Sequence, residues 1–148
     1  MPKALDNGCC ARCGAALPGG AFDCLQCGAS SQRLPRELDV DAFHAVRMSG
    51  ERPLVVHFRA QSCAPCLTLD PVFAQAALLR AGLCFASCDI DTYPSLRQDC
   101  NVRNAPTLAI YLAGRELGRI SGTMRLQTLL DWIDRLIQSA ASGGASKP

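Results

Sequence analysis

The sequence lacks a long hydrophobic run, and it lacks a strong excess of charge of either sign. Its longest apolar stretch lies around PLVV at residues 53–56 and is far too short to cross a bilayer. The formal net charge is only +2, and the basic residues are scattered along the 148-residue chain. Because proteins that bind nucleic acids or anionic lipids gather positive charge on one surface, we expect no nucleic-acid partner and no membrane partner.

The sequence also has few signals for transport or for a bound organic cofactor. The N-terminal residues MPKALDNGCC contain one lysine and no apolar segment of the kind a signal peptide needs, so we expect a cytoplasmic protein. No flavin or nicotinamide motif is present, so any such cofactor would belong to a partner enzyme. The rest is an ordinary globular mixture, long enough for one compact domain with a small appendage.

Cysteine is the residue that the chain has in unusual number, with ten in 148 residues. In a reducing compartment, paired cysteines indicate metal ligands or redox catalysts before structural disulfides. The groups are Cys9, Cys10, Cys13, Cys24 and Cys27 near the N-terminus, the pair Cys63 and Cys66, and the single residues Cys84, Cys88 and Cys100. We expect the first two single residues to lie in the core, whereas Cys100 stands at a helix end where exposure is possible.

The N-terminal cysteines form an internal repeat, CARCGA at residues 10–15 and CLQCGA at residues 24–29. Each Cys-x-x-Cys loop presents two thiolates to one side, and the glycine that follows permits the positive φ such a loop needs. Two loops supply the four sulfurs of a closed structural zinc site. The sequence therefore predicts a zinc lobe whose metal supplies most of its folding free energy. The predicted ligands are Cys10, Cys13, Cys24 and Cys27.

Alternatives remain for this lobe. The same cysteines would also allow two disulfides or unengaged thiols, and Cys9 would be able to replace Cys10, although the x-x spacing favours Cys10. Because a four-sulfur site has no open coordination position, we expect no hydrolytic chemistry there.

The rest of the chain alternates between strand and helix patterns. Strands are predicted at 53–58, 83–90, 107–112 and 115–120, and helices at 38–50, 64–81, 93–100 and 125–138. Pro71 lies inside the second helix and must kink it. The last helix has a one-sided apolar stripe, and Trp132 lies off that stripe. The order of elements predicts an α/β fold with helices on both faces of the sheet.

The most informative stretch is FRAQSCAPCLTLDP, residues 58–71, in which Cys63 and Cys66 flank Ala-Pro. Disulfide reduction needs a nucleophilic thiolate and a second thiol that resolves the mixed disulfide. At a helix N-terminus, unpaired N–H groups and the helix dipole favour the thiolate of the first cysteine. We therefore predict that Cys63 attacks and Cys66 resolves. A redox-silent pair or a second metal site remains the alternative.

Several landmarks in this part of the chain resemble the thioredoxin family. VVHFRAQSCAPC resembles the active-site strand and loop of that family. The other landmarks are the helix-kinking Pro71, the cis-proline motif APT at 105–107, the hairpin Gly114, and Gly122 before the last helix. The resemblance covers roughly residues 32–138, and with the N-terminal loops the whole chain resembles the zinc-containing thioredoxin-2 type. It implies a thioredoxin fold, with a central mixed sheet of four to five strands and helices on both faces, beside a zinc-ribbon-like lobe.

The resemblance also implies how substrate would bind. Pro106 would be cis and would face the dithiol. The backbone of Ala105 would then pair with an extended substrate segment, as an added strand does.

The sequence departs from the family around the dithiol. Ser62 and Arg59 stand where two tryptophans are usual, and Ala64 replaces a glycine. His57 aligns with the buried aspartate of the family, and Ser87 with its lysine partner.

These departures carry two functional hypotheses. His57 would accept or return a proton for Cys66, and Arg59, if near Cys63, would stabilise its thiolate. The alternatives are a hydrogen-bonded core histidine and an arginine that points to solvent.

These features together predict a cytoplasmic thiol–disulfide oxidoreductase that reduces or exchanges protein disulfides. Its partners would be protein disulfide substrates and a thioredoxin-reductase-like electron donor. The predicted segments are a zinc lobe at 1–30, a linker at 31–36, a thioredoxin-like domain at 37–138 and a disordered tail at 139–148. The alternative is a non-catalytic thioredoxin-like binding module that docks through the zinc lobe, which the altered loop favours and the retained dithiol opposes.

We predict that the Cys63–Cys66 pair of the zinc-loaded protein is a reversible two-electron redox couple. The measurement is its reduction potential in glutathione buffers, with Cys63→Ser as the control in which the couple is lost. Thiols that stay inert in the unsubstituted protein would contradict this prediction and would favour the binding module.

Overall fold

The computed structural model describes residues 35–49, 52–80 and 82–143. The predicted zinc lobe at 1–30 and its four cysteine ligands lie outside these residues. The fold and the dithiol site are therefore those of the segment that begins at Pro35.

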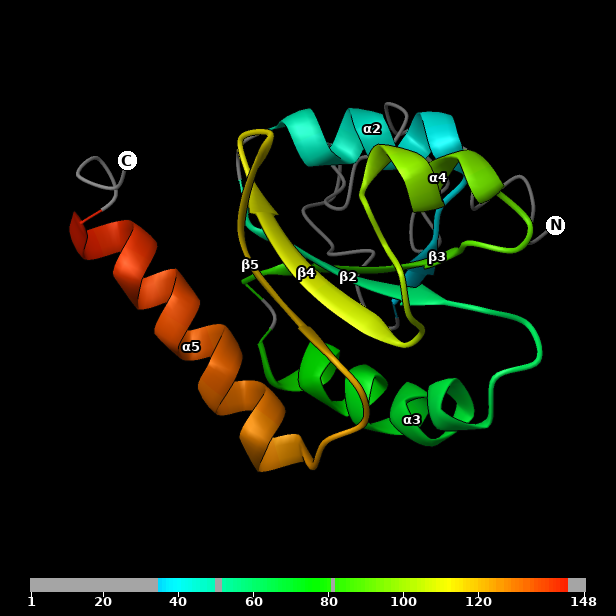
Figure 1. Ribbon diagram of the computed structural model, residues 1–148. Coiled ribbons are helices and arrows are strands. Elements are labelled where there is room, and N and C mark those ends of the chain that lie inside the picture. Colours follow the sequence, from blue (N-terminus) through cyan, green and yellow to red (C-terminus); the bar gives the residue numbers. More distant parts are fainter. Residues whose placement is uncertain (1–34, 50–51, 81, 144–148) are drawn as a thin grey trace, which may run out of the picture.

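Five strands form one mixed sheet in the order β1-β3-β2-β4-β5. The strands are β1 (Arg36–Glu37), β2 (Leu54–Arg59), β3 (Cys84–Asp89), β4 (Thr107–Leu112) and β5 (Arg115–Ser121). The helices are α2 (Val40–Ser49), α3 (Ala64–Leu79), α4 (Pro94–Asp99) and α5 (Leu126–Gly143). Figure 1 shows α2 and α4 on one face of the sheet and α3 and α5 on the other. The predicted mixed sheet with helices on both faces is confirmed.

Strand β2 occupies the centre of the sheet, parallel to β3 and antiparallel to β4. It is buried from Leu54 to Phe58, as expected for a strand that helices cover on both faces. Leu54, Val56 and Phe58 belong to the core cluster under α2 and α4, whereas Val55 belongs to the cluster under α3 and α5. Packing on both sides therefore fixes the end of β2 from which the dithiol loop departs.

The described helices follow the predicted pattern with one extension. Helix α5 continues past residue 138 to Gly143, into the segment predicted to be a disordered tail. Ala140 and Ala141 favour this extension because alanine has the highest helix propensity. Trp132 lies off the predicted stripe yet is only 8% exposed, because α5 contacts both α3 and β5 and so buries a wider face. Within the described residues, every helix is too short or too polar to cross a bilayer.

The shortest strand, β1, is the element that the sequence patterns miss. Its two residues pair in parallel with Ala86 and Ser87 of β3. Arg36 had been assigned to the predicted linker, because two residues are too few to show the alternation by which a strand is recognised.

Strand β2 also carries one fully buried polar residue, His57, on the face covered by α3. Its ring lies edge to face with Phe73 of α3, with 5.3 Å between the ring centroids. Burial disfavours the imidazolium and lowers the pKa of His57 to about 4, an effect that Asp70 opposes and Arg59 reinforces. His57 is therefore neutral at physiological pH.

We predict that folding stability falls in acid as His57 is forced to ionise. Its pKa is lower in the folded chain than the ordinary value of 6.5, so unfolding takes up a proton there between pH 6.5 and about 4. Neutral His57 therefore makes its full contribution to the free energy of unfolding above pH 6.5. That contribution is lost as the pH falls to about 4. The loss amounts to about 3 kcal/mol.

Urea unfolding across this pH range measures the effect in the unsubstituted protein and in His57→Leu. The variant should lack this part of the pH dependence. Leu108→Ala is the matched control, because Leu108 is the buried neighbour of His57 on β4 and does not titrate. Leu108→Ala should lower the free energy of unfolding at every pH and leave its change with pH as in the unsubstituted protein. If the free energy of unfolding of His57→Leu still falls with pH as in the unsubstituted protein, the prediction is wrong.

Candidate active site

The two cysteines of the SCAPC loop lie at the start of α3 and form a disulfide. Cys63 caps the helix, since its Sγ accepts a hydrogen bond from the backbone N–H of Cys66 at 3.1 Å. Pro65 stands in the first turn, where the missing N–H costs no helical hydrogen bond. Cys63 is partly exposed and Cys66 is fully buried. The first sulfur is therefore the one that a substrate reaches, and a backbone donor already points at it.

The chain before β4 lies at the same edge of the sheet as the dithiol loop. Phe58 near the end of β2 pairs with Thr107 at the start of β4. The peptide bond between Ala105 and Pro106 is cis, and the Pro106 carbonyl accepts a hydrogen bond from the Gly122 N–H at 2.9 Å. The cis-proline turn is thus held by Gly122, the residue after β5, at the end of the sheet from which the loop to Cys63 departs.

His57 lies beneath α3 and makes no hydrogen bond to any residue that the structure describes. Both of its ring nitrogens are buried, and within the described part of the chain neither has a partner in hydrogen-bond geometry. The nearest charged group is Asp70 of α3, whose Oδ1 lies 3.4 Å from Nδ1 of the ring. Burial without a partner costs free energy. Within the described residues the neutral imidazole therefore packs against Phe73 and makes no hydrogen bond.

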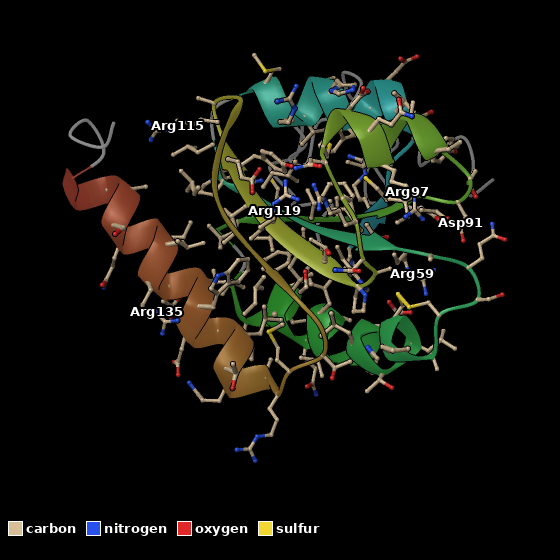
Figure 2. The ribbon with its side chains drawn as sticks, viewed as in Figure 1. Arg59, Asp91, Arg97, Arg115, Arg119 and Arg135 are labelled. Atoms are coloured by element: carbon tan, nitrogen blue, oxygen red, sulfur yellow. A yellow bond between two sulfur atoms is a disulfide. The ribbon has the colours of Figure 1, made fainter. Side chains whose placement is uncertain are left out.

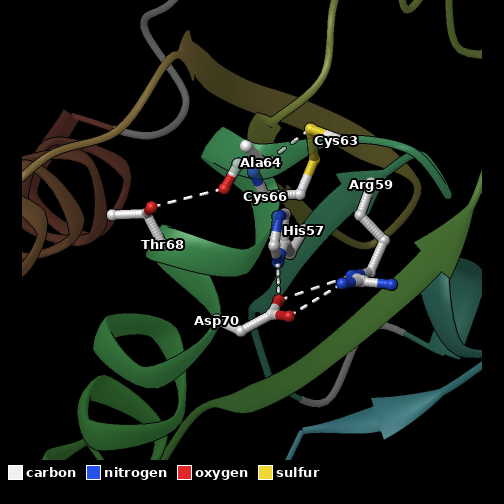
Figure 3. Close-up of polar contacts among 7 residues, drawn as sticks. All are labelled: His57, Arg59, Cys63, Ala64, Cys66, Thr68 and Asp70. Atoms are coloured by element: carbon white, nitrogen blue, oxygen red, sulfur yellow. Dashed lines mark hydrogen bonds and ion pairs between the residues drawn. A yellow bond between two sulfur atoms is a disulfide. The ribbon is translucent and has the colours of Figure 1, made fainter.

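Arg59 points toward Asp70 (Figure 3). Its Nη2 and Nε donate hydrogen bonds to the two carboxylate oxygens of Asp70 at 2.7 and 3.3 Å. This two-point contact is the geometry in which a guanidinium binds a carboxylate best. The polar contacts described for the Arg59 side chain are to Asp70. Arg59 therefore reaches the dithiol region through the same carboxylate that faces His57.

The three single cysteines lie on the other face of the sheet. Cys84 and Cys88 are buried in the core, as predicted, and Cys100 is partly buried. Burial raises the pKa of the Cys88 and Cys100 thiols. Because thiolates are the reactive form, these residues are weaker nucleophiles than an unperturbed thiol at neutral pH.

A polar groove of about 630 Å³ lies along β5 and α4, on the side of the sheet that α2 covers. Two of its arginines, Arg47 and Arg119, already have partners. Arg119, which is labelled in Figure 2, binds the Glu116 carboxylate and donates a hydrogen bond to the Cys100 carbonyl. Arg47 donates a hydrogen bond to the Gly114 carbonyl. The dithiol does not line this groove. We therefore place the chemistry at the start of α3.

The structure brings the predicted dithiol, His57 and the cis-proline turn to one end of the sheet, and it adds one residue. Asp70 was missed, although it follows Cys66 by four residues and so stands one helical turn further along the same face. That spacing was the available signal. The four predicted zinc ligands lie outside the described residues, and within those residues no group of three or more His, Cys, Asp or Glu side chains is arranged to hold a metal ion.

Comparison with known proteins agrees with this geometry. Residues 35–135 match the family described as Thioredoxin. The chain is 33% identical over 136 residues to Thioredoxin C-3 of Corynebacterium nephridii, which covers 87% of this chain and 94% of that protein. It is 32% identical over 90 residues to a bifunctional thioredoxin reductase/thioredoxin of Mycobacterium leprae, covering 60% of this chain and 20% of that one.

Solved structures show the same fold. The crystal structure of thioredoxin f from spinach chloroplast superimposes with a TM-score of 0.67 at 22% identity, covering 73% of this chain and 97% of that one. The family match spans well over half of the sequence and includes the disulfide-linked Cys-x-x-Cys pair. The chain belongs to the thioredoxin family and is a thioredoxin-type thiol–disulfide oxidoreductase.

Proposed function

We propose that the protein reduces protein disulfides, with Cys63 as the attacking thiolate and Cys66 as the resolving thiol. The observation that carries this order is the difference in accessibility between the two sulfurs. Cys63 is partly exposed at the helix N-terminus with a backbone N–H directed at its Sγ, whereas Cys66 is fully buried. Only Cys63 meets a protein-sized substrate without a change in the fold.

The two exchange steps balance as follows. The Cys63 thiolate attacks one sulfur of the substrate disulfide, and the other sulfur leaves with the electron pair and takes up a proton. Cys66 then loses its proton and attacks Cys63 Sγ, which breaks the mixed disulfide and releases the second substrate thiol. The dithiol has given up two electrons and ends as the disulfide of the structure. A donor must then reduce it.

The proposed electron donor is a thioredoxin-reductase-like enzyme. The Mycobacterium leprae relative carries the name of a thioredoxin reductase and of a thioredoxin in one chain, which supports this pairing. The proposed setting is the cytoplasm, where such a reductase keeps thiols reduced.

For the second step we assign His57 as the acceptor of the Cys66 proton. His57 is neutral and has no hydrogen-bond partner within the described residues, so its ring nitrogens are free to accept the proton of a thiol. Burial makes the ring a weak base by lowering its pKa to about 4, and the Asp70 carboxylate, which raises the pKa, favours the transfer. Arg59 tunes this step through its contact with Asp70 rather than through a described contact with Cys63.

Substrate would bind along the cis-proline turn. Among the described residues no hydrogen bond is recorded for the backbone of Ala105, which leaves it free to pair with an extended substrate segment beside Pro106. The exposed surface next to the dithiol is apolar at Leu67, which is 63% exposed. Leu67 would supply apolar contact area for a substrate in place of the two family tryptophans, whose positions Ser62 and Arg59 occupy here.

We predict that His57→Leu slows the second exchange step and spares the first. The reduced protein is mixed in a stopped-flow instrument with an aromatic disulfide that releases a coloured thiol in each step. The first phase should keep its rate, and the second should fall about a hundredfold because a positioned base is lost.

Cys66→Ser, which should show the first phase alone, assigns the phases, and Cys63→Ser supplies the background of the other thiols. His44→Gln on α2 is the matched histidine control and should behave as the unsubstituted protein. An unchanged second phase in His57→Leu would show that this histidine is a core residue only. If the unsubstituted protein shows neither phase, the dithiol mechanism itself is wrong.

We also propose that the chain is of the zinc-containing type, with Cys10, Cys13, Cys24 and Cys27 as ligands. The alignment with Thioredoxin C-3 covers 87% of the chain, a larger share than residues 35–148 make up, so it includes part of the segment that holds the repeat. Zinc bound by four thiolates would stabilise that segment and would take no part in the exchange steps.

The zinc proposal predicts about one zinc ion per chain in protein purified without chelator. Measured by atomic absorption, Cys13→Ser and Cys27→Ser should lose the metal, because each removes one of four sulfurs. Cys9→Ser should keep it. Full zinc content in Cys13→Ser, or none in the unsubstituted chain, would overturn the assignment.

A further inference from the structure

Three charged or titratable residues from two elements meet behind the dithiol. His57 and Arg59 come from β2, and Asp70 comes from α3 (Figure 3). The histidine is fully buried, whereas the Asp70 side chain is 39% exposed. Asp70 therefore lies between the buried imidazole and solvent.

The spacing along α3 places Cys66 and Asp70 on the face of the helix that covers the ring. Cys66, Asp70 and Phe73 stand at i, i+4 and i+7, which is one face of a helix. Phe73 and Asp70 both contact His57, and Cys66 is buried on that face. Figure 3 shows the ring between Cys66 and Asp70, with Nδ1 turned to the carboxylate. The other ring nitrogen, Nε2, is thus left for the cysteine.

Among the residues that the structure describes, Asp70 and Arg59 are the charged groups that act on the ring. On the neighbouring strands, Ser87 and Leu108 stand in register with His57, and Phe73 covers it from α3. The Asp70 Oδ1 lies 3.4 Å from Nδ1, close to the ring but not in hydrogen-bond geometry in this structure. Because the partner of one ring nitrogen fixes the tautomer, we expect this nearest carboxylate to decide which nitrogen carries the proton.

We propose that Asp70 is a positioning residue of the dithiol site, which holds the Nδ1–H of neutral His57 and so leaves Nε2 as the proton acceptor for Cys66. The inference rests on the proposed role of His57. During resolution, the proton of the Cys66 thiol passes to Nε2 and the thiolate attacks Cys63 Sγ. The imidazolium is then stabilised by the Asp70 carboxylate and returns its proton to solvent at the exposed side of that carboxylate.

Arg59 has a defined part in this arrangement. Its two hydrogen bonds hold the Asp70 carboxylate in one orientation, while its positive charge disfavours the imidazolium. The ring therefore remains neutral in the resting protein, and it is already oriented when the thiol of Cys66 loses its proton. In the family that this chain resembles, a buried aspartate stands on the strand at the position of His57. This chain carries its carboxylate on α3 instead, at Asp70.

The test combines a tautomer measurement with the rate of the second exchange step. The chain has only two histidines, so ring ¹⁵N spectra recorded in a His44→Gln background report His57 alone. The expected tautomer carries its proton on Nδ1. Asp70→Asn should shift the ring toward the Nε2–H tautomer and slow the second phase about tenfold, with the first phase unchanged.

Asp70→Glu, which restores the carboxylate, should recover part of the rate. Asp131→Asn on α5 is the matched control for loss of one carboxylate and should change neither readout.

The two readouts separate this inference from the proposed function. If His57→Leu slows the second phase and Asp70→Asn changes neither tautomer nor rate, the role of His57 stands and the inference about Asp70 is wrong. An unchanged tautomer in a folded Asp70→Asn protein overturns the inference whatever His57→Leu shows. If His57→Leu resolves at the unsubstituted rate, proton transfer through His57 fails, and with it the catalytic part of this inference.

Discussion

Burial of β2 on both faces is the constraint on which the rest of the structure depends. Its side chains alternate between two core clusters, one under α2 and α4 and one under α3 and α5. Because both faces are covered, the strand emerges only at its end, where the chain runs from Arg59 through an exposed loop into α3. The dithiol stands at this junction, so the packing that buries β2 also holds the helix N-terminus that favours the Cys63 thiolate.

The same burial gives His57 its chemical character. A polar ring between a central strand and a covering helix is desolvated, and desolvation keeps it neutral. The arrangement separates two groups: the ring is buried beneath α3, and the partly exposed Asp70 carries the charge, held by Arg59. A carboxylate at the helix surface avoids the cost of burying an ionised group in the strand.

Most of the fold could be predicted from the sequence because its elements are long and strongly patterned. The strand at 107–112 and the helix that contains Pro71 are found where the patterns place them. The exceptions have local reasons. Two residues at Arg36–Glu37 carry too little pattern to show a strand, and the alanine-rich end of α5 was mistaken for a tail because it lacks the apolar stripe.

The sequence by itself determined the chemistry that spacing encodes. Two cysteines on either side of Ala-Pro at a helix start specify a dithiol, and the APT motif marks the proline that is cis in the structure. Only the tertiary structure decided which groups lie together behind that dithiol. Arg59 reads as a neighbour of Cys63 along the chain, but its guanidinium binds Asp70, and Asp70 reaches His57 across the interface between helix and strand. Side-chain direction across a packed interface depends on the relative placement of β2 and α3, which local sequence patterns do not contain.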